Sequence, residues 1–595
     1  MKRKLLALSL AAVMAVSLAA CSSSTAPTQE AEPTEVETTV ASPDTAEPEG
    51  TKADETEAAG ETEKTGETEK AGDEMLIRST AFGDVKGTTK GDSLVWYGVP
   101  YGAAPIGELR WAAPEDPAEW TDILDCTEPA ERALQFGKNY ETNQNETIGT
   151  EDSLYLDIYS TTDAELRPVF VFIHGGNNQT GTSTEIEGSN IVVNDNCVYV
   201  SLSYRLGLLG FNCLPALHTE EGSTGNYTML DLAKALDWIK ANITAFGGDP
   251  NNITLSGFSA GGRDVMAALI SPLFADKFNK AIVFSGGMTV ADEAASASQI
   301  AWALAPLAVE DGKAADEAAA HDWLLTDAAE VKDYLFSITS DRLAPLMGNA
   351  GIRMSAFPHL YADGIVLPKE GFDTTTYNSV PVIMVTGADE FSMFAGFDAY
   401  YSSDAVKALD EDTQAAAKTF AVRYGSDMYR IFNAQCSAEK MSANYDSDIY
   451  IAQIDYDDVP TLGSFHGIFV PMFTGEHGYL SFSDFASAGY KDMAAKFNGY
   501  IANFLATGDP NSEEFGGWTP WTPDSKQSMV FDADDTTATA EMKDVSSTYE
   551  EIIAAMEADD TISDEVKLLD IQNVMNGRWF SAALDEHYGN PTLWK

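Results

Sequence analysis

Beyond residue 75 the apolar residues gather in short runs rich in β-branched side chains, and segments with helical spacing separate these runs. Such runs are typical of strands that are buried on both faces of a sheet. The expected strands span 169–173, 198–204, 253–256, 281–284 and 382–386. Between the second and the third of them, Leu232, Leu236 and Ile239 mark one face of a helix that is expected to end near Gly247. The alternation predicts an α/β fold, in which helices cover both faces of a mostly parallel sheet.

The first residues follow a different pattern, in which three basic residues at 2–4 precede an apolar run over 5–20 and then Cys21. This run is shorter than the roughly 20 apolar residues that a membrane-spanning helix needs, so it predicts a signal peptide over residues 1–20. The small residues before Cys21 resemble the lipobox of bacterial lipoproteins, which implies a lipid anchor on Cys21 and a place in the bacterial cell envelope, outside the cytoplasm. A plain secretory signal cleaved beside a cysteine is the alternative.

Residues 21–74 contain sixteen acidic residues and three lysines, and they have almost no aliphatic side chains before Met75. Such a composition cannot bury enough apolar surface to fold, and its charges repel one another. We therefore expect a disordered, extended linker over 21–74. No second linker is apparent beyond it, so residues 75–595 are expected to form one large domain.

Charge and composition narrow the range of functions. The 595 residues carry a formal net charge of −57, and a polyphosphate backbone would repel a chain that acidic, so the sequence argues against nucleic-acid binding. The sequence has no zinc-ligand cluster, no GxGxxG that opens a βαβ unit, no P-loop and no EF-hand spacing. We therefore predict neither a cofactor nor a metal.

A candidate nucleophile lies in the GxSxG sequence at 257–261, where Ser259 is the central residue. The expected strand over 253–256 precedes it, and an apolar segment over 265–270 that can continue a helix follows it. Strand, tight turn and helix are the context of a nucleophile elbow, in which the helix N-terminus and the Ala260 amide face developing negative charge. A structural turn with an exposed serine is the alternative.

A second motif lies upstream, directly after the expected strand over 169–173. Residues 174–177 read His-Gly-Gly-Asn, and such a loop presents backbone amides, as the HGGG loops of lipases and esterases do. The amides of Gly176, Asn177 and Ala260 are the predicted oxyanion hole, which an activated serine requires.

In these two motifs and in further segments, the chain resembles the type B carboxylesterases, the family of cholinesterases and bacterial para-nitrobenzyl esterases. Matching segments follow the family's order along nearly the whole of the expected domain: 97–101, 105–111, 151–157, 204–211, 225–227, 246–252, 257–261, 284–286 and 503–511. The resemblance implies the α/β-hydrolase fold and a serine esterase that acts through an acyl-enzyme.

The resemblance also implies the acid and the base. The family's acid follows a strand in a segment like the one at 386–391, which assigns Glu390 and not Asp389, although the residues alone would fit a solvated loop. The family's base lies in a segment like 464–471, which assigns His466. Of the other histidines His477 is the nearest rival, but its Gly-Glu-His-Gly setting is more typical of a surface turn.

Ser259, Glu390 and His466 occur in the chain order Ser, acid, His, which is the order of α/β-hydrolases. In the predicted roles Ser259 attacks the ester carbonyl, and His466 takes its proton and returns it to the leaving alcohol. Glu390 fixes the imidazole tautomer.

Three positions near the expected site depart from the family pattern. Asn177 replaces the third glycine of the oxyanion loop, Phe258 stands where these enzymes usually carry Glu, and Phe469 replaces a Glu three residues after the histidine. We interpret the three replacements as one coupled set. Because Phe replaces both of the family's Glu residues, neither Glu remains as a buried charge without a partner, which would be costly. We expect a more apolar pocket at Phe258 and Phe469, and an Asn177 amide that still serves, since Asn tolerates positive φ.

The cysteines leave alternatives open. Ser153 stands where many members of the family have a disulfide cysteine. The remaining Cys126, Cys197, Cys213 and Cys436 allow three full pairings, and buried free thiols are an equally good reading.

Two rival functions also stay open. Some relatives of cholinesterases lack a working triad and act as binding or adhesion proteins, and an amidase or peptidase would use the same triad. The main prediction is a serine carboxylic ester hydrolase that acts on neutral small-molecule esters outside the cytoplasm, with the membrane as a partner through Cys21. The sequence indicates neither the acyl and alcohol groups nor the oligomeric state.

Overall fold

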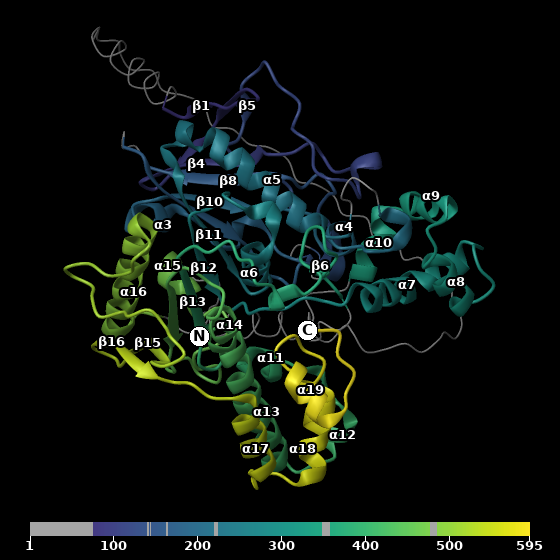
Figure 1. Cartoon of the computed structure of the whole chain (residues 1–595), viewed down its shortest axis with the longest axis vertical. Coiled ribbons are helices and arrows are strands. Elements are labelled where there is room, and N and C mark those ends of the chain that lie inside the picture. The colour runs from purple at the N-terminus through teal and green to yellow at the C-terminus, as the bar shows by residue number, and fades with distance from the viewer. Residues whose placement is uncertain are drawn as a thin grey trace, which may run out of the picture.

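The computed structural model describes residues 75–139, 142, 144–161, 165–218, 224–347, 357–475 and 485–594. The expected signal peptide, Cys21, the acidic linker and His477 lie outside these residues. Figure 1 shows a central sheet with helices packed on both sides of it and a group of helices below it.

The central sheet has eleven strands, and six neighbouring pairs from β10 to β15 are parallel. Antiparallel strands complete both edges. In sheet order the strands are β16 (Ala538–Asp544), β15 (Gln527–Ala533), β14 (Ile449–Ile454), β13 (Val382–Gly387), β12 (Lys280–Phe284), β11 (Gly248–Phe258), β9 (Arg167–Ile173), β10 (Val198–Leu202), β8 (Tyr155–Ser160), β4 (Ser93–Pro100) and β3 (Thr88–Lys90). The predicted fold class, an α/β-hydrolase fold with a mostly parallel sheet, is confirmed.

Alternate side chains of β9 enter two separate cores. Val169, Val171 and Ile173 belong to one buried apolar cluster, whereas Phe170 and Phe172 belong to the other, as the period of two of a strand requires. The first cluster includes residues of α5 (Tyr227–Asn242) and α6 (Ala260–Ile270), and the second includes residues of α3 (Ser189–Asn194), α15 (Val470–Thr474) and α16 (Ala488–Thr507). Helices therefore cover both faces, as predicted.

The other elements extend this framework. Small strands form two further sheets: β1 (Ile77–Ser79), β2 (Asp84–Lys86) and β5 (Leu124–Asp125) in one, and β6 (Gln135–Asn139) and β7 (Gln144–Ile148) in the other. The remaining helices are α4 (Gly207–Gly210), α7 (Glu293–Glu310), α8 (Glu317–Leu324), α9 (Ala329–Ser337), α10 (Ser340–Met347), α11 (Ser392–Gly396), α12 (Asp404–Lys407), α13 (Glu411–Asn433), α14 (Gln435–Met441), α17 (Tyr549–Ala558), α18 (Asp564–Asp570) and α19 (Ala582–Tyr588). In Figure 1, α7 to α9 extend to one side and α17 to α19 lie below the sheet.

The five expected strands are all present, although β11 (Gly248–Phe258) is longer at both ends than the expected 253–256. The run over 198–204 leaves the ladder after Leu202, and Tyr204 instead stacks on His174 with 4.4 Å between the ring centroids. The expected helix is α5, and its last turn continues as a 3₁₀ turn up to Gly247, whose φ of 87° only glycine adopts readily. Within the described residues, no helix is long and apolar enough to cross a membrane.

The structure chooses between the two readings of the cysteines. Cys126, Cys197, Cys213 and Cys436 are all free thiols, and the first three are buried. Burial raises the pKa of Cys126 and Cys436 to about 12. They therefore pack as small apolar side chains rather than as bridges.

Candidate active site

Ser259 occupies a tight turn between β11 and α6. Its backbone has φ 56° and ψ −114°, and its amide donates to the carbonyl oxygen of Phe284 at 2.9 Å. The turn needs glycine nearby, because a Cβ on Gly257 would lie 2.3 Å from the carbonyl oxygen of Gly261. Strand, strained turn and helix follow one another as the motif predicts, and the serine is half-buried.

Glu390 lies in the loop that follows β13 and is fully buried. Its Oε1 accepts hydrogen bonds from Ser285 Oγ at 2.5 Å, from Thr386 Oγ1 at 3.1 Å and from the Gly387 amide at 2.8 Å. Its Oε2 lies 2.5 Å from His466 Nδ1. The two predicted partners are thus in direct contact, and one oxygen of the carboxylate is fixed by three donors while the other faces the imidazole.

The neighbouring Asp389 has a different position. Its amide donates to the Ser464 carbonyl oxygen, and its Oδ2 accepts from the Ser464 amide, each at 3.0 Å. Burial raises the pKa of Asp389 above its usual value. Asp389 therefore joins the loop that carries Glu390 to the loop that carries His466, rather than contacting the imidazole.

Three aromatic rings surround His466. The ring of Phe258 lies 4.7 Å from the imidazole, that of Phe394 lies 5.1 Å away edge-on, and that of Tyr429 is stacked at 5.4 Å. Because Phe258 directly precedes Ser259, the first contact brings the base beside the elbow. His466 Nε2 is buried and forms no hydrogen bond with the described residues, so it is available to accept a proton.

The loop after β9 approaches the elbow closely. A Cβ on Gly175 would lie only 3.3 Å from Ser259 Cβ, so any larger residue would crowd the serine. Asn177 has φ 59°, the positive value anticipated for it. Among the described residues, the amides of Gly176, Asn177 and Ala260 donate to no protein acceptor, which is the condition that an oxyanion hole requires.

The three departures from the family pattern have different partners in the structure. The Phe258 and Phe469 rings are 5.1 Å apart and both are buried, which fits the expected apolar surroundings. The Asn177 side chain has polar partners: its Oδ1 accepts from Arg263 Nη2 at 3.2 Å and its Nδ2 donates to Gln179 Oε1 at 2.5 Å. Phe258 and Phe469 thus pack on each other, and Asn177 is held by polar side chains.

Sequence reasoning missed several residues at this site. Arg263 follows Ser259 by four positions on the same helix, and that spacing could have drawn attention to it. Ser285 lies in one of the matching segments, but nothing there indicates its bond to Glu390. Phe394 and Tyr429 carry no local signal at all, because only the fold brings α11 and α13 to the base.

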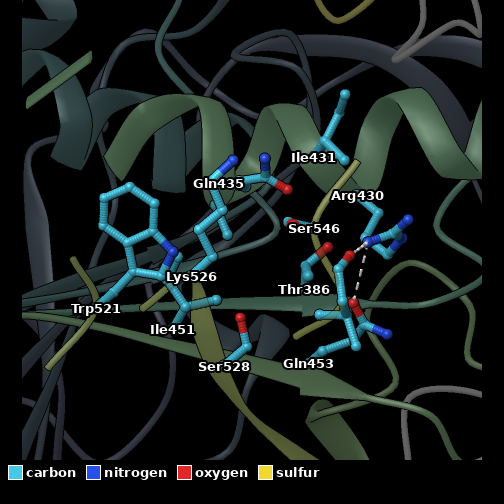
Figure 2. Close-up of a pocket in the computed structure, with 12 residues that line it drawn as sticks. Thr386, Arg430, Ile431, Gln435, Ile451, Gln453, Trp521, Lys526, Ser528 and Ser546 are labelled. Carbon is cyan, nitrogen blue, oxygen red and sulfur yellow. Dashed lines mark hydrogen bonds between the residues drawn. The ribbon is translucent and has the colours of Figure 1, made fainter. Parts of the chain in front are cut away.

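One pocket lies behind the acid loop. Figure 2 shows it between α13 and the strands, lined by Thr386 among others, with Arg430 Nη1 donating to Gln453 Oε1 at 3.4 Å. Ser259 and His466 are not among its lining residues. No group of three or more His, Cys, Asp or Glu side chains in the described part of the chain could hold a metal ion.

Comparison with known proteins gives the family of this chain. The family model described as the carboxylesterase family matches residues 74–424. The chain belongs to the carboxylesterase family. The match includes Ser259 and Glu390, whereas His466 lies beyond its end. This carboxylesterase is accordingly a carboxylic ester hydrolase.

Relatives of the carboxylesterase are found in bacteria and animals. It is 27% identical over 481 residues to the para-nitrobenzyl esterase of Bacillus subtilis (strain 168), which covers 77% of this chain and 95% of that protein. It is 38% identical over 221 residues to esterase B1 of Culex pipiens, which covers 36% of this chain and 40% of that protein. A solved PNB esterase has a TM-score of 0.63 at 24% identity, covering 80% of this chain and 100% of that one, and supports the fold.

Proposed function

We propose that this carboxylesterase cleaves neutral small-molecule esters with Ser259 as nucleophile, His466 as general base and acid, and Glu390 as the group that orients the imidazole. The observation that carries the proposal is the buried contact of 2.5 Å between Glu390 Oε2 and His466 Nδ1, next to a serine held in a strained turn. Nucleophile, base and orienting group in this order are the recognised arrangement for acyl transfer.

In the proposed cycle Ser259 Oγ attacks the ester carbonyl carbon while His466 Nε2 accepts the serine proton. The oxyanion is held by the amides of Gly176, Asn177 and Ala260. When the tetrahedral intermediate collapses, His466 donates the proton to the leaving alcohol, and an acyl-enzyme remains. Water then attacks the acyl carbon with His466 again as base, and the acid is released.

The surroundings favour uncharged substrates. Phe258 and Phe469 make the region beside the base apolar, and neither offers a carboxylate to attract a cation. The net charge of −57 repels anionic esters in solution. An ester without charge in its acyl or alcohol part is not repelled by the protein and needs no buried counter-charge beside the base.

We further propose that the enzyme acts outside the cytoplasm, tethered to the bacterial envelope by lipid on Cys21 and held away from the membrane by the acidic linker. The support is the sequence pattern before Cys21 and the composition of 21–74. Fractionation of cells that express the chain and a Cys21→Ala variant tests this, since the wild type is expected in the membrane fraction and the variant in the soluble one. A wild type that is soluble contradicts the anchor.

The test of the chemistry is hydrolysis of para-nitrophenyl acetate and butyrate by the full chain and by Ser259→Ala. A loss of about 10⁴-fold or more in kcat is expected. Labelling of Ser259 by an uncharged fluorophosphonate, read by mass spectrometry, does not depend on the choice of substrate. A wild-type protein that neither hydrolyses the esters nor labels at Ser259 would instead support a binding protein.

A further inference from the structure

A buried cation lies one helical turn behind the candidate nucleophile. Arg263 is on α6, its side chain is 1% exposed, and its backbone amide donates to the Ser259 carbonyl oxygen at 3.0 Å. Among the described residues, its guanidinium contacts several groups: Nη2 donates to Asn177 Oδ1 at 3.2 Å, Nη1 lies 2.9 Å from His359 Nε2, and the group stacks over Trp579 at 4.8 Å from the ring centroid. The side chain is thus held on three sides.

The positive charge of this cluster belongs to Arg263. Burial, and the nearby guanidinium, lower the pKa of His359 well below its usual value, so the imidazole is neutral. Its Nδ1 lies 3.0 Å from the Phe357 carbonyl oxygen and donates to it, which leaves Nε2 as the acceptor for Arg263. Burial lowers the pKa of Arg263 only to about 10, so the guanidinium stays protonated at neutral pH.

We propose that Arg263 is a positioning residue for ester hydrolysis, which fixes Asn177 in the oxyanion loop and supplies a buried positive charge behind the oxyanion. This inference rests on the proposed function, because it assigns to Arg263 a part in stabilising the same tetrahedral intermediate.

The backbone of the loop explains why such a clamp is needed. Asn177 and Asn178 have φ values of 59° and 55°, a conformation that non-glycine residues adopt at a cost. Each side chain is tied to the next residue along α6: Asn177 to Arg263, and Asn178 Nδ2 to Asp264 Oδ1 at 2.9 Å. Two successive helix residues therefore hold two successive asparagines, and the Asn177 amide keeps its direction.

The charge itself acts where the oxyanion forms. A guanidinium in a site without bulk water is poorly screened, so it favours negative charge that develops nearby more than a surface arginine would. Because the ester carbonyl gains that charge only in the transition state, the effect belongs to kcat rather than to KM.

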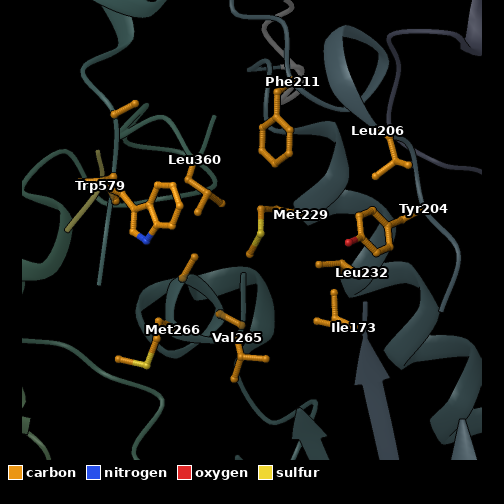
Figure 3. Packing of buried hydrophobic residues seen from close by; sticks show 14 of the residues in the cluster. Ile173, Tyr204, Leu206, Phe211, Met229, Leu232, Val265, Met266, Leu360 and Trp579 are labelled. Atoms are coloured by element: carbon orange, nitrogen blue, oxygen red, sulfur yellow. The ribbon is translucent and has the colours of Figure 1, made fainter. Parts of the chain in front are cut away.

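Arg263 is also linked, through aromatic rings, to the base His466. Figure 3 shows Trp579 and Leu360 beside the turn of α6 that carries Val265 and Met266. The Trp579 ring that the guanidinium faces lies 5.4 Å from the ring of Tyr429, which in turn stacks on His466 at 5.4 Å. One side chain thus contacts the oxyanion loop directly and the base through two rings.

The experiment compares Arg263→Met, Arg263→Lys, Asn177→Gly and Arg263→Met/Asn177→Gly in the full chain. The readouts are kcat and KM on para-nitrophenyl butyrate, the thermal unfolding midpoint, and the stoichiometry of fluorophosphonate labelling at Ser259. Leu269→Ala is the matched control, since this fully buried residue of α6 lies more than two turns beyond Ser259 and outside the site.

Arg263→Met is expected to lower kcat by roughly 10- to 100-fold, the range of one hydrogen bond to a charged group, with KM within about twofold. Arg263→Lys should recover part of kcat because it keeps the charge. In the double variant the two losses should not multiply, because each single change breaks the same contact. Leu269→Ala should lower the unfolding midpoint and leave kcat within about twofold.

Two results would overturn the proposal. One is a kcat for Arg263→Met within about twofold of wild type, whatever its unfolding midpoint. The other is a loss of kcat in the double variant that equals the product of the two single losses, together with a kcat for Arg263→Lys no higher than that of Arg263→Met. A purely structural residue would give this result. Stoichiometric labelling of wild-type Ser259 in the same experiment separates these outcomes from a failure of the proposed function, in which the wild type does not label.

Discussion

Replacing Glu390 by Gln tests the triad at the atom that sets the imidazole tautomer. The glutamate Oε1 accepts from the Gly387 amide at 2.8 Å and from the hydroxyls of Ser285 and Thr386. The hydroxyls can turn and accept instead, but the amide can only donate. A carboxamide that turned its nitrogen toward Gly387 would leave this buried donor unpaired, at roughly 1–3 kcal/mol. The Gln oxygen therefore stays at the Oε1 position.

The Gln nitrogen must then face His466 Nδ1, which becomes an acceptor. The imidazole proton moves to Nε2, the atom that should take the proton of Ser259, and the negative charge opposite the imidazolium is lost as well. The expected loss is about 10⁴-fold in kcat, the size seen when a triad acid becomes an amide. Since Gln keeps the hydrogen bond to Gly387, the thermal unfolding midpoint should change little.

The assay is the release of para-nitrophenolate from the acetate ester, followed by absorbance, with unfolding measured on the same samples. Glu390→Asp is the companion variant, because it keeps the charge and shortens the reach, and it should retain more activity than Glu390→Gln. A folded Glu390→Gln protein that keeps more than about a tenth of the wild-type kcat would refute the assignment of Glu390.

Three further changes have defined outcomes. Asn177→Gly removes a buried side chain from the oxyanion loop and should shift preference toward longer acyl chains, which a series of para-nitrophenyl esters measures; an unchanged preference contradicts it. Phe469→Ala removes a ring stacked at 4.2 Å on Phe284 and should lower the free energy of unfolding by about 3–5 kcal/mol in denaturant titrations. Burial raises the pKa of Asp264 to about 7. As pH rises from about 4 to 7, the carboxyl therefore loses its proton in the unfolded chain before it does so in the folded chain, and the free energy of unfolding of the wild type falls. Asp264→Asn removes this cost. Between pH 4 and pH 8 the free energy of unfolding of the variant should therefore rise, relative to that of the wild type, by up to roughly 4 kcal/mol. The same pH dependence in both proteins would contradict the prediction.

The elbow and the interior strands could be predicted because their signals are local. The turn at Ser259 needs glycines at fixed positions, and each of β9 to β13 contains a short run rich in apolar and β-branched residues. β14 is buried along its whole length, yet Gln453 interrupts its run, and β16 is partly exposed and reads as polar. Neither strand was among those expected.

The residues of the active site also differ in how far local sequence signals reveal them. Glu390 and His466 were assigned only through resemblance to a family, because an acidic loop and a histidine carry little meaning alone in so acidic a chain. Ser285 lies 105 positions before Glu390, and Tyr429 reaches His466 from a helix on another part of the chain. Contacts of this kind depend on how the whole sheet is assembled, and no spacing in the sequence encodes them.

The pairing of Asp389 with Ser464 has a consequence for how this enzyme can change. Two hydrogen bonds join the two loops just before the acid and the base, one between backbone groups and one from the Ser464 amide to Asp389 Oδ2, and the Gly387 and Ile454 ends of β13 and β14 are already neighbours. The segment 455–463 between β14 and this junction is therefore a loop closed at both ends. Its exposed positions 457, 458, 460 and 461 can be varied without altering the separation of Glu390 and His466, whereas Tyr456, Val459 and Leu462 are buried in the apolar core. These four positions are therefore natural places to diversify the enzyme while its proton-transfer pair stays intact.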